Sequence, residues 1–299
     1  MANGTGEPPI RDVVLFENSG DPFDPRTNDH PPIRERVEVG GGVYIERLPA
    51  ELNRKIKGAC AFRGHNWEIH MDTLPTLYAF IRETNDTDRC DEGEQLQVAV
   101  AISRLCNPTS IALEFAARVY APGVRHQTDY VVQPALIAGH GNQAFMPDPN
   151  GRNWLTRDDV GGLPALIAAF GGAPDRIRRA AWFHEYAART EHVPVRLTLV
   201  ATGIEALVHL ETVRSTRQFV VGATGLASDC GLTFTATQAS DAYDQRSRCA
   251  HGATVLAAPP PVLIELEAVL RAALRRALLD PAYAGVFLSD ANIRTRFPL

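Results

Sequence analysis

The feature that most constrains this chain is a stretch of helical periodicity, bounded by prolines, near its C-terminus. Between Pro261 and Pro281, apolar residues recur at spacings of three and four, which places them along one side of a helix. Proline can begin a helix but cannot continue one, so the pattern predicts a helix over residues 262–279. The apolar stripe consists of Val262, Leu266, Val269, Leu270, Ala273, Leu274 and Ala277. A stripe of this width must be buried against other helices.

Similar signals predict more helices from about residue 156 onward. Thr156 and Asp159 are typical of a helix start before residues 163–170, and Gly171-Gly172 ends that segment. Pro174-Asp175 opens another helix. The apolar stripe of that helix is Ile177, Ala180, Ala181, His184 and Ala188, and that of the next helix is Leu197, Val200, Ile204 and Leu207. Helices that follow one another this closely predict an antiparallel helical bundle.

The first half of the chain carries mixed signals. Residues 1–36 contain six prolines among acidic and glycine residues, which predicts a flexible N-terminal arm. The apolar run Val13–Phe16 within it fits an edge strand. Residues 37–150 are expected to form a smaller α/β or mixed region with a sensing or regulatory role. The fold class expected for the whole chain is therefore mainly α, with a mixed N-terminal region.

Local patterns give individual elements in this mixed region. The β-branched and aromatic run 43–45 predicts a strand, and Pro49 predicts a helix that runs to about Lys57. Residues 74–84 are expected to be helical. Residues 95–105 and 111–120 fit either a helix or a strand, because their apolar residues satisfy both periods.

A Gly-, Asn-, Asp- and Pro-rich stretch at 139–162 predicts a long loop. We place the start of a C-terminal domain, residues 151–299, inside this stretch. No apolar run approaches the 18 residues that a membrane-spanning helix needs, and residues 1–9 have no apolar segment typical of a secretory signal. A cytoplasmic protein without a membrane partner is expected.

Charge alone does not predict nucleic-acid binding. The formal net charge is -5. The segment from residue 151 onward carries 16 Arg against 14 Asp and Glu, so it is less acidic than the first half but not a basic domain. Arg outnumbers Lys 28 to 2, a bias that genomic base composition also produces.

Neither a disulfide framework nor a metal site is indicated. The five cysteines have no Cys-x-x-Cys spacing, so reduced thiols are expected. His65 and His70 lack the spacing that places two ligands on one helix face. We therefore expect no metal and no cofactor.

One short motif combines residue types suited to RNA cleavage. Arg246 and His251 are separated by four residues and lie next to Gly252, near an expected helix end. With 28 Arg and 9 His, roughly one such pair is expected by chance. A second pair, Arg179 and His184, falls inside a continuous helix, where His184 lies on the apolar stripe. A core histidine is the better interpretation of His184.

Four segments together resemble the HEPN superfamily, and within it the ApeA-like group of bacterial phage-defence and abortive-infection proteins. They are, in order, "LTLVATGIEALVHL", "RQFVVGATGL", "AYDQRSRCAHG" and "LIELEAVLRAALRRALLD". The resemblance covers roughly residues 151–285. The combined pattern is far more specific than the Arg-x4-His spacing alone.

This resemblance implies a metal-independent endoribonuclease, active in anti-phage defence or as a toxin. Arg246 and His251 would be the catalytic pair, with Ser247 as the polar residue after the arginine. RNA supplies its own nucleophile, the 2′-hydroxyl, while histidine moves a proton and arginine holds the phosphate. HEPN domains usually pair so that both Arg-His sets line one cleft, which implies a homodimer with a composite active site. A trigger or antitoxin partner would control it.

Three further residues are candidates for supporting roles. Glu205 lies next to an apolar stripe, where a carboxylate needs a partner, and Arg246 is the expected one. The alternative for Glu205 is a surface position. Tyr243, one turn before Arg246, is either a core residue or a site residue. Arg248 either binds phosphate or is a solvated surface arginine.

Two other hypotheses stay open. The first is a HEPN module that has lost activity and serves RNA binding or protein assembly, because a fold does not guarantee a function. The second sets the resemblance aside and treats the chain as a helical adaptor whose Arg246 and His251 are structural. That adaptor predicts that the two side chains point apart or into the core.

Overall fold

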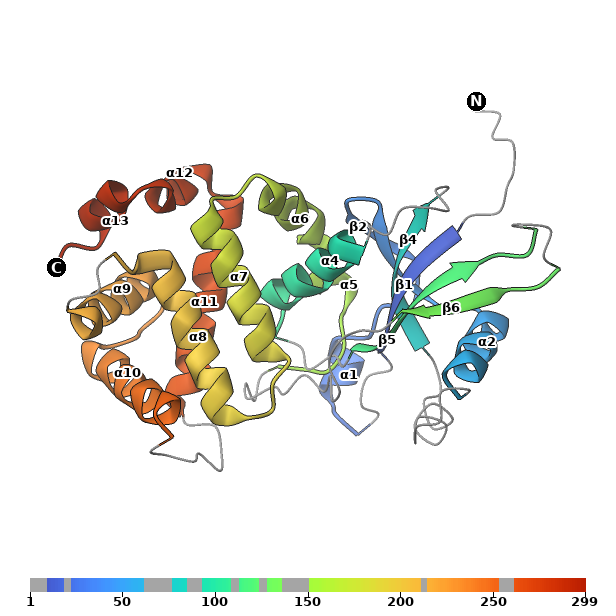
Figure 1. Ribbon diagram of the computed structural model, residues 1–299, viewed down its shortest axis with the longest axis horizontal. Coiled ribbons are helices and arrows are strands. Elements are labelled where there is room, and N and C mark those ends of the chain that lie inside the picture. The colour runs from blue at the N-terminus through green and yellow to red at the C-terminus, as the bar shows by residue number, and fades with distance from the viewer. Residues whose placement is uncertain are drawn as a thin grey trace. The chain divides into compact units, whose positions relative to one another are not determined.

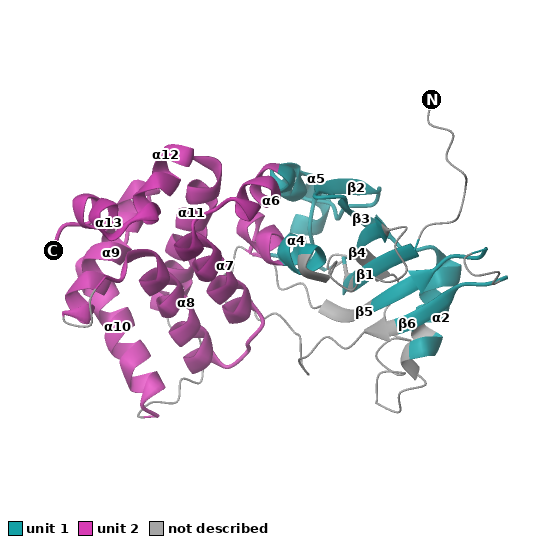
Figure 2. Cartoon of the chain, turned by 45° about the horizontal axis from the view of Figure 1, so that its top comes forward, with its two compact units in different colours: residues 1–100, 111–142, 152–164 teal, residues 101–110, 143–151, 165–299 magenta. Residues whose placement is uncertain are grey.

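The structure is a computed structural model, drawn in Figure 1. It describes residues 10–18, 23–61, 77–84, 93–108, 113–123, 128–135, 151–210, 214–252 and 261–299. The chain divides into two compact units, coloured separately in Figure 2. The N-terminal unit comprises residues 1–100, 111–142 and 152–164, and the helical unit is built mainly from residues 165–299.

The N-terminal unit is organised around a six-stranded antiparallel sheet. Its strands are β1 (Ile10–Glu17), β2 (Val37–Gly40), β3 (Val43–Arg47), β4 (Leu77–Thr84), β5 (Leu113–Tyr120) and β6 (Val131–Ala135). Their order in the sheet is β2-β3-β4-β1-β5-β6, and every neighbouring pair is antiparallel. The expected strand at residues 43–45 is confirmed as part of β3.

The first strand is central, not at an edge. β1 pairs with β4 on one side and β5 on the other. Val13 is 1% exposed and Phe16 is fully buried, with the Phe16 ring 5.0 Å from that of Phe80. The predicted edge strand, and with it the flexible arm, is therefore wrong for residues 10–17. Tertiary pairing on both edges outweighs the disorder-prone composition around this run.

Helix α2 (Ala50–Ala61) covers one face of the sheet. Its Leu52 and Ile56 are fully buried, in one cluster with residues of β1, β3, β4 and β5. The members contributed by the strands are Val13, Tyr44, Ile81, Ala117 and Val119. The helix expected over residues 49–57 is confirmed and continues for one further turn. The short helix α1 (Arg26–Asp29) lies between β1 and β2 in the chain.

Three more segments of the first half of the chain can be compared with their predicted secondary structure. Residues 95–105 lie in helix α4 (Gly93–Cys106), whereas residues 113–120 form β5. Residues 77–84 form β4, so the predicted helix there is wrong, and residues 74–76 lie outside the described part. Phe80 and Ile81 are adjacent and both buried, because both faces of β4 are covered. A strand buried on both faces lacks the alternation that identifies strands in a sequence.

The boundary between the units differs from the expected one. Residues 152–164 belong to the N-terminal unit, so the division falls at about residue 164 and not at 151. The Asn18 side chain is fully buried and makes two hydrogen bonds with the backbone of Leu155. Its Oδ1 accepts from the Leu155 amide at 2.6 Å, and its Nδ2 donates to the Leu155 carbonyl at 3.2 Å. The Trp154 indole donates to the His30 carbonyl at 2.7 Å. These bonds attach the segment to the N-terminal strands. The remainder of the predicted loop, 139–150, lies outside the described residues.

Helices follow one another from residue 157 onward. They are α5 (Arg157–Gly161), α6 (Leu163–Gly171), α7 (Asp175–Ala188), α8 (Val193–Val208), α9 (Ser215–Asp229), α10 (Ala236–Ala250), α11 (Pro261–Leu279), α12 (Pro281–Ala284), a 3-10 turn η2 (Gly285–Leu288) and α13 (Asp290–Arg296). The predicted Thr156–Asp159 helix start is confirmed as a reciprocal capping box of α5. The mainly-α fold class with a mixed N-terminal region is also confirmed.

Helix α11 lies at the centre of the helical unit. It contacts α7, α8, α9 and α10, and every residue of its predicted stripe is at most 9% exposed. The stripes predicted for α7 and α8 are buried as well. Gly203 on α8 lies against α11, because an added Cβ there would come within 2.6 Å of the Leu270 side chain. None of the described helices is long and apolar enough to cross a membrane.

A buried ion pair joins α8 to α11. The Arg196 guanidinium donates to both carboxylate oxygens of Glu267, with Nη2–Oε1 at 2.7 Å and Nε–Oε2 at 3.1 Å. Their side chains are 2% and 10% exposed. Such a bidentate pair fixes the rotation of one helix against the other, because the planar guanidinium accepts one approach geometry.

We expect Asn18→Ala to destabilise the N-terminal unit. The change leaves the buried amide of Leu155 without its partner, which costs about 1–3 kcal/mol for an unsatisfied group, whereas the Leu155 carbonyl keeps the hydrogen bond from the Ile33 amide. Chemical denaturation, followed by circular dichroism, would measure the loss. The exposed Asn28 changed to Ala is the matched control. Equal midpoints for the two variants would contradict the anchoring role of Asn18.

Candidate functional site

Helix α10 carries the predicted catalytic motif close to its C-terminal end. The helix begins at a capping box formed by Thr235 and Gln238 and ends at Ala250, with His251 as the C-cap. Gly252 then adopts a left-handed conformation, with φ of +69°, which a residue without a Cβ adopts at little cost. The expected helix end beside His251 is confirmed.

Arg246 is held by the expected carboxylate. Its Nη2 donates to Oε2 of Glu205 on α8 at 3.0 Å, and the two side chains are 25% and 18% exposed. The pairing predicted for Glu205 is therefore confirmed, and its alternative of an isolated surface position is wrong. The Nε of Arg246 is buried and has no hydrogen-bond partner among the described residues. The bond to Glu205 occupies one donor of the guanidinium, so the other donors on its Nη nitrogens remain for an added anion.

Tyr243 supports Arg246 from the same helix. The centre of its ring lies 5.2 Å from the ring centre of Phe219 on α9, and Phe219 is 1% exposed. The same ring centre lies 5.6 Å from the guanidinium carbon of Arg246. Tyr243 therefore packs against the core on one side and touches the arginine on the other. A cation–π contact of this kind restricts where the guanidinium can point.

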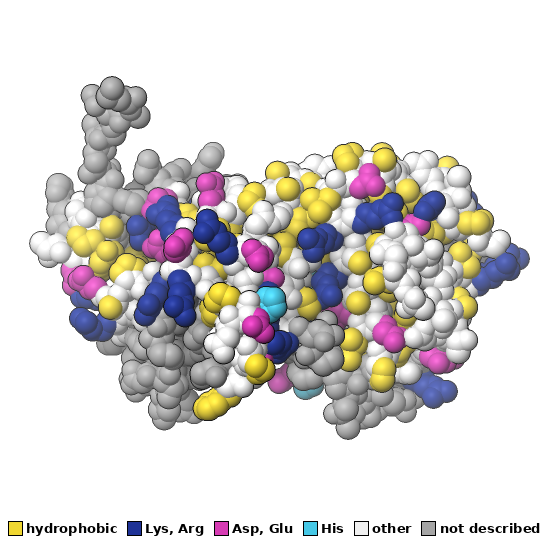
Figure 3. Space-filling model, turned by 180° about the vertical axis from the view of Figure 1, so that it is seen from behind, with side chains coloured by type: hydrophobic (Ala, Val, Ile, Leu, Met, Phe, Trp, Pro, Cys, Tyr) yellow, Lys and Arg dark blue, Asp and Glu magenta, His cyan; other side chains and the backbone are white. Residues whose placement is uncertain are grey.

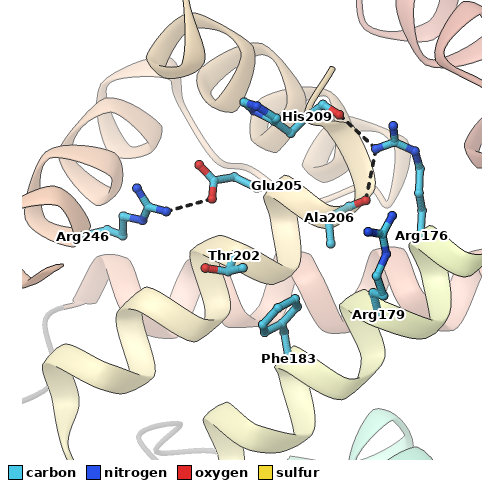
Figure 4. Close-up of a pocket in the computed structure, with 8 residues that line it drawn as sticks. All are labelled: Arg176, Arg179, Phe183, Thr202, Glu205, Ala206, His209 and Arg246. Atoms are coloured by element: carbon cyan, nitrogen blue, oxygen red, sulfur yellow. Dashed lines mark hydrogen bonds and ion pairs between the residues drawn. The ribbon is translucent and has the colours of Figure 1, made fainter. Parts of the chain in front are cut away.

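Arg246 and Glu205 line a pocket of about 520 Å³ within the helical unit (Figure 4). The lining side chains come from three helices: Arg176, Arg179 and Phe183 from α7, Thr202, Glu205 and Ala206 from α8, and Arg246 from α10, with His209 at the C-cap of α8. Figure 4 shows Arg246 on one side, Arg176 and Arg179 on the other, and Glu205 between them. Three arginines and one carboxylate make this pocket a candidate anion-binding site.

The structure does not bring His251 to this pocket. His251 is exposed and is absent from the lining residues, as is the exposed Arg248. Ser247 is partly buried and also lies outside the lining. Five positions along a helix correspond to a rotation of about 140°, which separates His251 from Arg246 around the axis of α10. Within one chain, therefore, His251 does not line the pocket that Arg246 enters.

The two residues of the second Arg-x4-His pair, Arg179 and His184, lie in different environments. His184 is 2% exposed and lies in the core, as predicted, whereas Arg179 is exposed and lines the pocket. Burial, together with the nearby charges of Arg271, Arg196 and Arg104, lowers the pKa of His184 to about 3. This histidine is therefore neutral near pH 7 and serves packing, not proton transfer to solvent.

The sequence did not predict six lining residues: Arg176, Arg179, Phe183, Thr202, Ala206 and His209. Helical spacing could have placed three of them on one side of a helix, but not in a pocket. Arg176, Arg179 and Phe183 recur at three and four residues on α7, on the side away from its apolar stripe. Their meeting with Arg246 depends on how α7 and α10 each pack against α8, which no local pattern records.

Charge is dispersed on the one face of the molecule that Figure 3 draws. On the face seen in Figure 3, basic and acidic side chains are interspersed and do not form one basic patch. Among the described residues, no group of three or more His, Cys, Asp or Glu side chains could hold a metal ion. The histidines at 65 and 70 lie outside the described part. The pocket is thus the best-defined place for an anionic ligand.

No protein-family model, no curated protein and no solved structure matches this chain. The resemblance to HEPN domains therefore rests on the sequence motifs alone.

The buried state of His184 predicts a pH dependence of stability. In the unfolded chain a histidine titrates near pH 6.5, so the unfolded state binds the proton more tightly than the folded state. The free energy of unfolding should fall as the pH drops from 6.5 toward 3, by about 1.4 kcal/mol per pH unit. His184→Gln should remove this part of the dependence.

Urea denaturation of both proteins at pH 7 and pH 5 would test this expectation. The exposed His192 changed to Gln is the matched control. If the wild type and His184→Gln lose the same stability between the two pH values, His184 does not carry the effect.

Proposed function

We propose that this protein is a metal-independent endoribonuclease of the HEPN type, with Arg246 and His251 as its catalytic residues. One observation carries the proposal most directly: Arg246, the arginine of the motif, lines a pocket and is oriented by Glu205. The exposed His251 caps the same helix, where substrate or a second subunit can reach it. We place the activity in the cytoplasm, as a defence or toxin effector controlled by a trigger.

The proposed chemistry uses groups that RNA and these residues provide. The 2′-hydroxyl oxygen attacks the neighbouring phosphorus, the bond to the 5′-oxygen breaks, and a 2′,3′-cyclic phosphate and a 5′-hydroxyl result. His251 either takes the 2′-hydroxyl proton or delivers one to the leaving oxygen. Arg246 neutralises charge that builds on the phosphate oxygens. Ser247 and Arg248 follow Arg246 on the same turn, where they would contact the RNA backbone.

A homodimer would reconcile this chemistry with the geometry of one chain. Arg246 faces the pocket while His251 points to solvent, so a composite site can join Arg246 of one subunit with the partner's His251. Such an arrangement needs an isologous contact near the C-terminal end of α10. Mixing the Arg246→Ala and His251→Ala proteins would then restore part of the cleavage, because one site in each mixed dimer is intact.

Removing either catalytic group should abolish cleavage. We expect Arg246→Ala and His251→Ala each to lower the cleavage rate of total RNA at neutral pH by at least about 100-fold. The assay contains EDTA, and sequencing of the ends detects the 2′,3′-cyclic phosphates. The exposed Arg217 and His192, each changed to Ala, are matched controls that should cut normally.

Equal cleavage by the wild type and both variants would refute the nuclease proposal. RNA that is bound but never cut, with and without cell extract from infected bacteria as a trigger, would favour the second candidate, an inactive RNA-binding or assembly module. The position of His251 outside the pocket is the observation that favours this candidate. A protein that neither binds nor cuts RNA would favour the helical adaptor.

Glu205 should act as a positioning residue. Glu205→Gln removes the charge that orients the Arg246 guanidinium, so we expect kcat to fall by about 10- to 100-fold with a smaller change in KM. Kinetics on a fluorogenic oligoribonucleotide separate the two constants. The exposed Glu191 changed to Gln is the control. A loss of thermal stability that accounts for the whole loss of activity would contradict a positioning role.

A further inference from the structure

The α7 side of the pocket carries one positive charge that the described residues do not balance. Arg176 is already held by protein acceptors: its Nη1 donates to the carbonyls of Ala206 at 3.3 Å and His209 at 2.9 Å, and its Nη2 donates to Asp290 at 2.7 Å. Arg179 lies one turn further along α7, is exposed, and makes no hydrogen bond or ion pair with any residue that the structure describes. Its five donors are available to a ligand.

The rest of the lining does not compensate this charge. Glu205 is the one carboxylate in the lining, and its Oε2 already accepts from Arg246. Asp290, which pairs with Arg176, already balances that neighbouring charge and leaves Arg179 as the arginine of the lining without an acid among the described residues. An anion beside Arg179 would satisfy its free donors.

The shape of the pocket suits an anion that belongs to a larger ligand. Its volume of about 520 Å³ exceeds what a lone phosphate needs and falls within the usual range for small-molecule sites. Arg179 and Arg246 enter from opposite sides, with Phe183 and Thr202 between them (Figure 4). A strand that places one phosphate at Arg246 can therefore place another on the α7 side.

We propose that Arg179 binds a backbone phosphate of the RNA strand next to the phosphate held by Arg246, so that the pocket is a two-phosphate subsite. This inference rests on the proposed function for the identity of the strand. Arg179 would contribute to binding and not to bond breaking, because it lies across the pocket from the predicted catalytic arginine. Arginine holds a phosphate through two parallel hydrogen bonds, which gives the strand a defined register.

The test is binding of a fluorescent oligoribonucleotide with 2′-O-methyl groups, which cannot be cut, measured by anisotropy over a range of salt concentrations. Arg179→Ala should raise Kd by about tenfold and reduce the salt dependence by roughly 0.7 in the slope of log K against log salt, the value for one lost contact to single-stranded RNA. Arg179→Lys should keep most of the slope. Arg178 is the matched control, because this exposed neighbour on α7 pairs with Asp175 and does not line the pocket.

The outcomes separate this inference from the nuclease proposal. If Arg179→Ala binds like Arg178→Ala, or if the wild type does not bind the probe, the subsite is refuted. If cleavage still requires Arg246 and His251 while Arg179→Ala leaves Kd and KM unchanged, the subsite fails and the nuclease proposal stands. If binding depends on Arg179 but no RNA is ever cut, the subsite stands and the nuclease proposal fails.

Discussion

The buried contact between Arg196 and Glu267 is the interaction on which the candidate site depends. It sets the rotation of α8 against the central helix α11, and Gly203 lets the two helices approach closely. Because Glu205 follows on the same helix, this rotation also decides where its carboxylate meets α10. A buried ion pair adds little net stability, but loss of one partner costs about 3–5 kcal/mol since the other charge is stranded. The pair therefore specifies geometry more than it adds stability.

The arginines of the pocket have three different electrostatic situations. Arg176 is neutralised by carbonyls and Asp290 and joins α7 to the end of α8. Arg246 is balanced by Glu205 yet keeps an unpartnered Nε, so it is oriented without being saturated. Arg179 has no balancing acid among the described residues. The three arginines therefore have different roles: Arg176 is structural, Arg246 is positioned by Glu205, and Arg179 is free to bind a ligand. The acceptors around each side chain determine its role, and the sequence motif does not.

The sequence predicts the helical unit well and the sheet poorly, for one physical reason. Helices α7, α8 and α11 each bury one side, so their apolar stripes are visible at spacings of three and four. Strands β1 and β4 are covered on both faces, which erases the alternation that would identify them. In the site, the partner of Arg246 could be predicted because a carboxylate beside an apolar stripe needs a counter-charge. Arg179 could not, because its place in the pocket follows from the packing of three helices.

The central position of β1 has a consequence for biosynthesis. β1 leaves the ribosome before both of its partners, so one edge stays unpaired until β4 emerges and the other until β5, which ends at Tyr120, has emerged. The two hydrogen bonds between Asn18 and Leu155 join residues 137 positions apart, so they form after the strands have emerged. Unpaired strand edges recruit other strands, so the nascent chain passes through a long aggregation-prone interval. The prolines and acidic residues that flank this strand are suited to keeping it soluble during that interval.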